Sequence, residues 1–214
     1  MLKLASSIVC LLLVFTVAGC GGKKRAAKHS TMPSTASTLP TPPSTKHVQP
    51  DEEILAEAIR GQHISPGEVA ILSDRMLSDG SPTFKNEKTM ARLDIILNKS
   101  LDNAPRDVRS RLLRNLGIIH YHQCKYSLAR QEIQQANELF PRDARTHYYL
   151  ARLAIQNGCI YQSKGLSKKA KGQFNLAANE MELARKLEPS NPAYRQDVKQ
   201  VIQKERTCPP DSKK

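Results

Sequence analysis

Apolar residues recur at helical spacing along most of the chain from residue 51 onward. The clearest run contains two apolar sets, at Leu113, Leu116, Gly117 and His120, and then at Ala129, Ile133, Ala136 and Phe140. Residues spaced by three and four lie on one face of a helix. The run therefore predicts two amphipathic helices joined by a turn. Gly117 and Ala129 fall where antiparallel helices must approach closely, and Pro141 ends the unit.

The same spacing returns 34 residues further along the chain. The equivalent positions are His147, Leu150, Ala151 and Ala154, followed by Ala177, Met181, Ala184 and Pro189. Ala151 and Ala177 are 26 residues apart, where Gly117 and Ala129 are 12 apart, so the second unit carries an insertion of 14 residues. Shared equally, the insertion adds seven residues, about two turns, to each helix. We favour lengthened helices over the alternative, a glycine-punctuated loop.

This pattern resembles the tetratricopeptide repeat, a helix–turn–helix with the signature W-x2-L-G-x2-Y…A-x3-F…P. Leu113 stands in place of the tryptophan, His120 of the tyrosine and Ile133 of the phenylalanine. The resemblance covers residues 110–191. It implies an all-α solenoid of about seven helices that acts as a binding scaffold. The sequence contains no nucleophile elbow, phosphate loop or zinc-protease motif, so no catalytic residues, cofactors or metals are expected.

The remaining helices are expected on either side of the two repeats. Residues 51–109 should form an N-terminal helical region that covers the first repeat, with helices at 51–60, 66–78 and 86–103. Ser65 and Glu68 form a capping box at the start of the second of these helices. Residues 192–206 should form a capping helix, and 207–214 a loose tail.

The N-terminus has the features of a lipoprotein signal. Residues 1–19 combine Lys3 with a short apolar run, and the segment 17–20, VAGC, resembles a bacterial lipobox. This resemblance implies cleavage after Gly19 and acylation of Cys20, which would anchor the chain to a lipid bilayer. An ordinary signal peptide and a transmembrane anchor are the alternatives. By resemblance to enterobacterial lipoprotein sorting, Gly21 after the cysteine implies the outer membrane, facing the periplasm.

Residues 20–50 are rich in Pro, Ser and Thr and lack apolar periodicity, so a disordered linker is expected between anchor and helices. The formal net charge is +13, and five of the basic residues lie in this linker, where they would face anionic headgroups. Because an exported lipoprotein rarely meets nucleic acid, we expect no nucleic-acid partner.

A binding groove is the expected functional feature, because the resemblance implies that the first helix of each repeat lines the concave face. Its predicted residues are Arg111, Arg114, Ile118, Tyr121, His122, Arg145, Tyr148, Arg152 and Ile155. Arginine and tyrosine are enriched in binding hot spots, and a guanidinium matches a carboxylate. The predicted ligand is therefore an acidic segment or a chain terminus of another protein. The alternative is a merely solvated basic face.

The cysteines are candidates for a disulfide, and three His and Cys residues for a metal site. Cys159 with Cys208 is the first choice for a disulfide and Cys124 with Cys159 the second, while three unpaired thiols are the alternative. His120, His122 and Cys124 alternate along a helix, so neighbours in this trio point about 200° apart, and a packed histidine is favoured over a metal ligand.

The function expected from these features is that of a membrane-anchored, periplasm-facing scaffold that binds a partner protein. By resemblance, it would assist assembly of an envelope complex such as a type IV pilus or secretion secretin, as a pilotin does. One alternative is an accessory factor for outer-membrane protein assembly or for peptidoglycan enzymes. Another is a polyanion or polysaccharide binder that uses the groove and a basic knob, Lys164, Lys168, Lys169 and Lys171.

Overall fold

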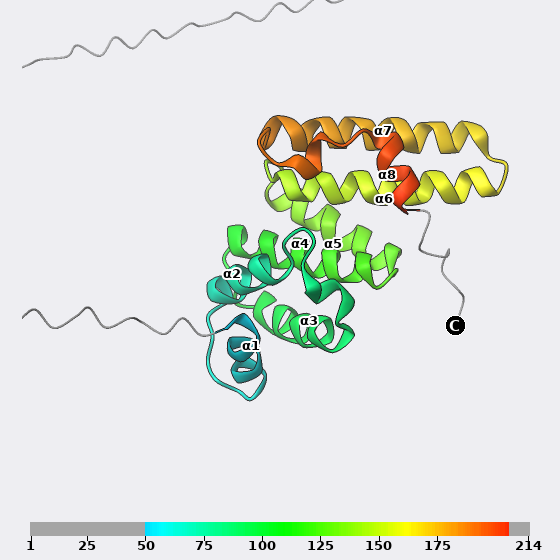
Figure 1. Cartoon of the computed structure of the whole chain (residues 1–214). Helices are drawn as coiled ribbons and strands as arrows, with labels where there is room; N and C mark the ends of the chain where they lie inside the picture. Colours follow the sequence, from blue (N-terminus) through cyan, green and yellow to red (C-terminus); the bar gives the residue numbers. More distant parts are fainter. Residues whose placement is uncertain (1–49, 206–214) are drawn as a thin grey trace, which may run out of the picture. The chain divides into compact units, whose positions relative to one another are not determined.

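The computed structural model describes residues 50–205, with side chains up to residue 202, and Figure 1 shows its helices. Within that range there is no strand, which confirms the all-α fold class. The range contains eight α-helices and two 3₁₀ turns, where about seven helices were predicted. The α-helices are α1 (Asp51–Ile59), α2 (Pro66–Met76), α3 (Glu87–Leu101), α4 (Arg106–His122), α5 (Tyr126–Leu139), α6 (Ala144–Ser163), α7 (Ser167–Leu187) and α8 (Val198–Glu205). The 3₁₀ turns are η1 (Pro82–Lys85) and η2 (Pro192–Arg195).

The described residues, 50–205, belong to one compact unit. No helix among residues 50–205 is both long enough and apolar enough to cross a bilayer. The predicted signal peptide, the lipidation site Cys20, the linker up to residue 49 and the tail 207–214 lie outside the described residues.

Local capping signals set the starts of α2 and α3. The Ser65 hydroxyl accepts a hydrogen bond from the Glu68 N–H, and the Glu68 carboxylate accepts one from the Ser65 N–H at 2.8 Å. This reciprocal pair confirms the predicted capping box. Asn86 caps α3 in a similar way, accepting from the Thr89 N–H at 3.1 Å. These caps satisfy backbone donors that the first helical turn would otherwise leave without partners.

The two repeats form two antiparallel helical hairpins, α4–α5 and α6–α7. In each hairpin the two helices are joined by a three-residue turn of the same conformation. The middle residue of each turn has a left-handed backbone, Cys124 with φ 60° and Gly165 with φ 71°. The N–H groups of Lys125 and Leu166 donate to carbonyls five residues earlier, each at 2.9 Å. Because the turn is equally short in both hairpins, the inserted residues do not form a separate loop.

The insertion is helical, as predicted. Helix α4 ends five residues after Gly117, whereas α6 ends twelve residues after the equivalent Ala151, seven residues further. Helix α7 has 21 residues against 14 in α5, so the returning helix also gains seven. The α6–α7 hairpin is thus extended by about two turns on each helix, or roughly 10 Å.

Close helix crossings hold both hairpins together. A Cβ atom placed on Gly117 would lie 2.5 Å from Cγ1 of Ile133, and one on Gly158 would lie 2.4 Å from the Phe174 ring. Gly117 meets the predicted stripe residue Ile133, whereas Gly158 lies in the inserted segment. The lengthened helices therefore keep the same kind of glycine contact that joins the shorter pair.

The inner face of the hairpins, defined as the side of α4 and α6 that carries the predicted groove residues, is covered by the chain itself. Helices α2 and α3 pack on α4, and α8 packs on α6. The predicted capping helix is divided into η2 and α8, and Val201 of α8 is 3% exposed. One predicted stripe position is wrong. Phe140 is 48% exposed because α5 ends at Leu139 and Phe140 takes an extended backbone.

Replacing Gly117 by alanine is expected to destabilise the chain by about 1–3 kcal/mol, because the new methyl group overpacks against Ile133. Gly172 is the matched control, since it lies in α7 with no atom within 4 Å of an added Cβ. Alanine there should stabilise the chain by up to about 1 kcal/mol through helix propensity. Urea unfolding of the two variants measures both changes. Equal effects of the two substitutions would contradict the close crossing.

Candidate functional site

The predicted groove residues do not line an open groove. Five of them are at most 8% exposed, namely Arg114, Ile118, Tyr121, Tyr148 and Ile155. The other four are partly exposed, namely Arg111, His122, Arg145 and Arg152. This corrects the sequence-based prediction of an open groove. The physical reason is that α2, α3 and α8 bury apolar surface against the face that was expected to stay free.

A buried ionic network fixes Arg114 in place. Its guanidinium donates to Asp143 at 2.6 Å and also to Asp74 of α2. Arg111 donates to Asp74 at 2.5 Å, and Asn115 donates to the same carboxylate at 2.7 Å. Burial would raise the pKa of Asp74, but Arg114, Asn115 and Arg111 together hold it below its usual value. Asp74 therefore stays ionised, and the network joins α2, α4 and the start of α6.

The carboxylates expected on a partner are thus supplied by the chain itself. Asp74 and Asp143 engage two of the four predicted arginines, and a third, Arg145, donates to the backbone carbonyl of Leu77. These contacts give no support to the expectation that an acidic partner segment binds the inner face.

The remaining arginine, Arg152, lies over an aromatic cluster. Its guanidinium carbon is 4.5 Å from the ring centre of Tyr121, 5.2 Å from that of Tyr149 and 5.6 Å from that of Tyr148. His122 stacks on Phe84 of η1, with ring centres 3.8 Å apart. This cluster packs η1 against α4 and α6.

The aromatic cluster also fixes the charge state of His122. Burial lowers the pKa of His122, and the positive charges of Arg152 and Arg145 lower it further, to about 3. The imidazole is therefore neutral at physiological pH and acts as a packed ring.

Two members of the candidate metal trio, His120 and His122, have separate surroundings. His120 pairs with Glu132 at 2.6 Å and lies 3.7 Å from Asp94, whereas His122 stacks on Phe84. No group of three His, Cys, Asp or Glu residues within 50–205 is placed to hold a metal ion. Cys124 and Cys159 are both half-buried, and no disulfide joins them, which corrects the second choice of pairing. Cys208 of the first choice lies outside the described residues.

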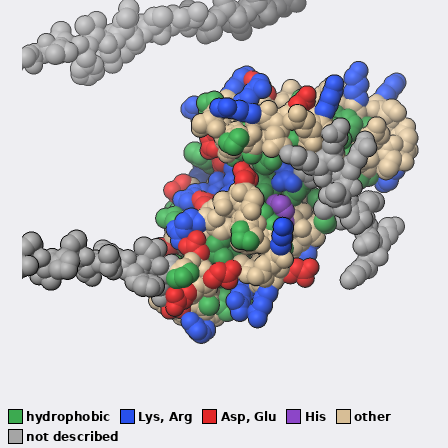
Figure 2. All heavy atoms as spheres, in the orientation of Figure 1, with side chains coloured by type: hydrophobic (Ala, Val, Ile, Leu, Met, Phe, Trp, Pro, Cys, Tyr) green, Lys and Arg blue, Asp and Glu red, His purple; other side chains and the backbone are tan. Residues whose placement is uncertain are grey.

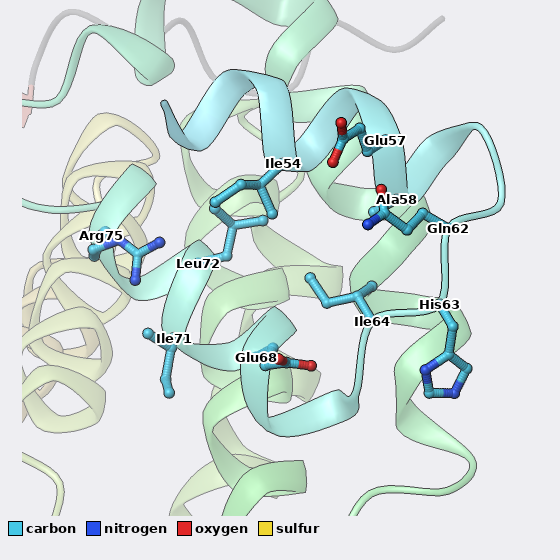
Figure 3. A pocket seen from close by; sticks show the side chains of 10 residues that line it. All are labelled: Ile54, Glu57, Ala58, Gln62, His63, Ile64, Glu68, Ile71, Leu72 and Arg75. Atoms are coloured by element: carbon cyan, nitrogen blue, oxygen red, sulfur yellow. The ribbon is translucent and has the colours of Figure 1, made fainter. Parts of the chain in front are cut away.

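Several clefts are open in the described part, and two of them bear on the candidate site. The first lies between α1 and α2 and has a volume of about 280 Å³ (Figure 3). Ile54 from α1, Ile64 from the connecting loop and Leu72 from α2 converge on it, while His63 points away. Ile71 at its edge is 47% exposed. The complete lining is Ile54, Glu57, Ala58, Gln62, His63, Ile64, Glu68, Ile71, Leu72 and Arg75.

The second open cleft lies where α4 and α6 begin and where α5 and α7 end, with a volume of about 290 Å³. Of the predicted groove residues it contains Arg111 and Arg114, both of which already pair with Asp74. Its complete lining is Asp107, Arg111, Arg114, Phe140, Arg142, Asp143, Ala144, Leu187 and Glu188. Since Arg111 and Arg114 are already ion-paired, the α1–α2 cleft is the better candidate binding site.

The α1–α2 cleft lies in the acidic part of a basic chain. Residues 51–79 contain seven Asp or Glu residues and two arginines, although the whole chain has 33 Lys and Arg against 20 Asp and Glu. Arg75 at the edge is engaged by Asp51 at 2.6 Å. Sequence reasoning missed this site, although the acid-rich stretch and the apolar positions around it were visible.

Glu68 and His63 line the cleft and Ser65 lies next to them in the chain, but Ser65 and Glu68 have the geometry of a helix cap. The Ser65 hydroxyl donates directly to Glu68 at 2.7 Å. In a catalytic triad the histidine stands between the nucleophile and the acid. Here His63 points away from the cleft (Figure 3), so these three residues are not arranged as a triad.

Stability should depend on pH through His120. Burial opposes its protonation, but Asp94 and Glu132 outweigh burial and raise the pKa of His120 from 6.5 to about 9. The stabilisation from the protonated imidazole is then complete below about pH 6.5 and is lost as the pH rises to about 9, and it amounts to roughly 3 kcal/mol. The stability advantage of wild type over His120→Gln should shrink across this window in chemical denaturation. A constant advantage would contradict the charged pairing, and His122→Gln, which removes a neutral ring, serves as the control.

Comparison of the chain with protein-family models, with curated proteins and with solved structures finds no significant match to any of them.

Proposed function

We propose that this protein is a lipid-anchored helical scaffold of the bacterial cell envelope that binds a partner protein in the α1–α2 cleft. The observation that carries the proposal is the exposed Ile71 beside the converging Ile54, Ile64 and Leu72. An open apolar cleft on a folded surface is a common binding feature. The proposal keeps the scaffold function expected from the sequence but moves the binding site from the inner face to the N-terminal helices.

The size of the cleft is at the lower end of the range for small-molecule sites. Small-molecule sites usually span about 300–1,000 Å³, and this cleft is near 280 Å³. One or a few apolar side chains of a partner segment would fill it. The surrounding acidic residues, including Glu57 and Glu68, favour a segment in which those apolar residues alternate with lysine or arginine. The proposed ligand therefore has the opposite charge from the one that the groove arginines suggested.

In this proposal Cys20 carries the lipid, and residues 21–50 connect the anchor to the helices. An anchored scaffold with one small docking cleft suits the delivery or assembly of an envelope complex. A role at an outer-membrane secretin is preferred, and a role with outer-membrane protein assembly or peptidoglycan enzymes is the alternative. The genes neighbouring this one would separate these roles.

The binding proposal can be tested with a photo-crosslinking residue at position 71 of the full-length chain in cells. A discrete crosslinked protein is expected from position 71 and not from position 95. Ile95 of α3 is the matched control, because it is an isoleucine with 60% exposure outside both clefts. Lys or Arg next to apolar residues in the captured segment would support the assigned chemistry. Equal crosslinking from positions 71 and 95 would exclude the cleft as the site.

The anchor is tested separately by mass spectrometry of the mature N-terminus. The expected N-terminal residue is a Cys20 that carries acyl chains. An unmodified Cys20, or a chain that still contains residues 1–19, would refute the anchor and leave the crosslinking result unaffected.

A further inference from the structure

The free end of the α6–α7 hairpin, residues 161–171, has surface chemistry distinct from the rest of the fold. Every residue from 162 to 169 is exposed. Because each helix is seven residues longer than its counterpart in α4–α5, this hairpin tip has no equivalent in the shorter hairpin. In Figure 2 blue side chains stand along the outer edge of this hairpin, and no red appears at its free end on the face shown.

The charge of the hairpin tip is of one sign. Its four lysines are Lys164, Lys168, Lys169 and Lys171, and the sequence contains no Asp or Glu between Asp143 and Glu180. None of the salt bridges found among residues 50–205 involves these four lysines. Their charge is therefore available to an anionic surface.

The hairpin tip also exposes apolar surface among its lysines. Leu166, directly after the left-handed Gly165, is 41% exposed. Lys169 lies with its ammonium 5.8 Å from the ring centre of Tyr161. Tyrosine and leucine beside lysine are the residues that enter the headgroup region of a bilayer, where the apolar part is buried and the charge stays at the surface.

We propose that the hairpin tip binds the anionic headgroups of a phospholipid surface, with Leu166 entering the headgroup region. A convex turn suits a broad surface better than a peptide, which binds in a groove or along a strand edge. The lysines would each approach a phosphate group, and their attraction is additive and sensitive to salt. The inference does not depend on the α1–α2 cleft or on acylation of Cys20.

Co-sedimentation with vesicles tests the proposal. Residues 47–214 are the protein to use, because this compact unit contains the whole described core and lacks the N-terminal apolar run and the linker lysines before His47. It should sediment with vesicles of phosphatidylcholine mixed with phosphatidylglycerol and not with pure phosphatidylcholine. Rising salt should release it.

Two variants locate the binding to the hairpin tip. Lys168→Gln/Lys169→Gln should weaken partitioning by about ten-fold or more, and Leu166→Ser should weaken it further at high salt. The matched control is Arg185→Gln/Lys186→Gln, which removes two charges near the other end of the same helix. Equal losses from the two charge pairs would overturn the proposal in favour of a general effect of net charge. Unchanged thermal unfolding shows that each variant is folded.

Two competitors distinguish the sources of negative charge. An excess of soluble glycerol phosphate should not release the protein, because a single headgroup engages few lysines at a time. Release by this compound would assign an isolated phosphate site instead of a lipid surface. Binding to polyglutamate without binding to anionic vesicles would assign the hairpin tip to an acidic protein and overturn the proposal.

Discussion

The buried guanidinium of Arg114 is the constraint on which the arrangement of the N-terminal helices depends. At 7% exposure this charge needs partners, because an unpaired charge inside a protein costs several kcal/mol. Its partners are Asp74, in the last turn of α2, and Asp143, the N-cap of α6. Satisfying Arg114 therefore requires α2 to dock on α4 beside the second hairpin. That docking places η1 and its ring Phe84 over the same face.

Because the chain itself covers the inner face, the arginines there stabilise the fold and are not open to partners. Arg114, Arg145 and Arg152 hold the chain together through two carboxylates, a carbonyl and a set of tyrosines. The open features lie elsewhere and differ in charge. The α1–α2 cleft is apolar within an acidic stretch, and the α6–α7 hairpin tip is basic. The fold thus offers two chemically different surfaces, which we assign to a basic apolar protein segment and to an anionic lipid surface.

Sequence reasoning recovered the features that are set by neighbours in the chain. Periodicity located the helices, Ser65 and Glu68 fixed the start of α2, and the spacing from Ala151 to Ala177 predicted the seven-residue extension of both α6 and α7. Sequence reasoning failed where the burial of a side chain depends on residues distant in the chain. Arg114 was predicted to be accessible because the repeat resemblance implies that the first helices line an open concave face, and its burial depends on Asp74, 40 residues away. Periodicity shows which face of α4 is apolar, but it does not show that α2 will cover the other one.

Arginine footprinting tests most directly whether the chain itself fills the inner face. Phenylglyoxal modification of the folded protein, mapped by mass spectrometry, compares Arg114 with Arg142, which is exposed at the start of the second repeat. Closure predicts that Arg142 reacts readily and that Arg114 reacts only when the protein is unfolded. Reaction of Arg114 at the rate of Arg142 in the folded protein would show an open inner face and contradict the account.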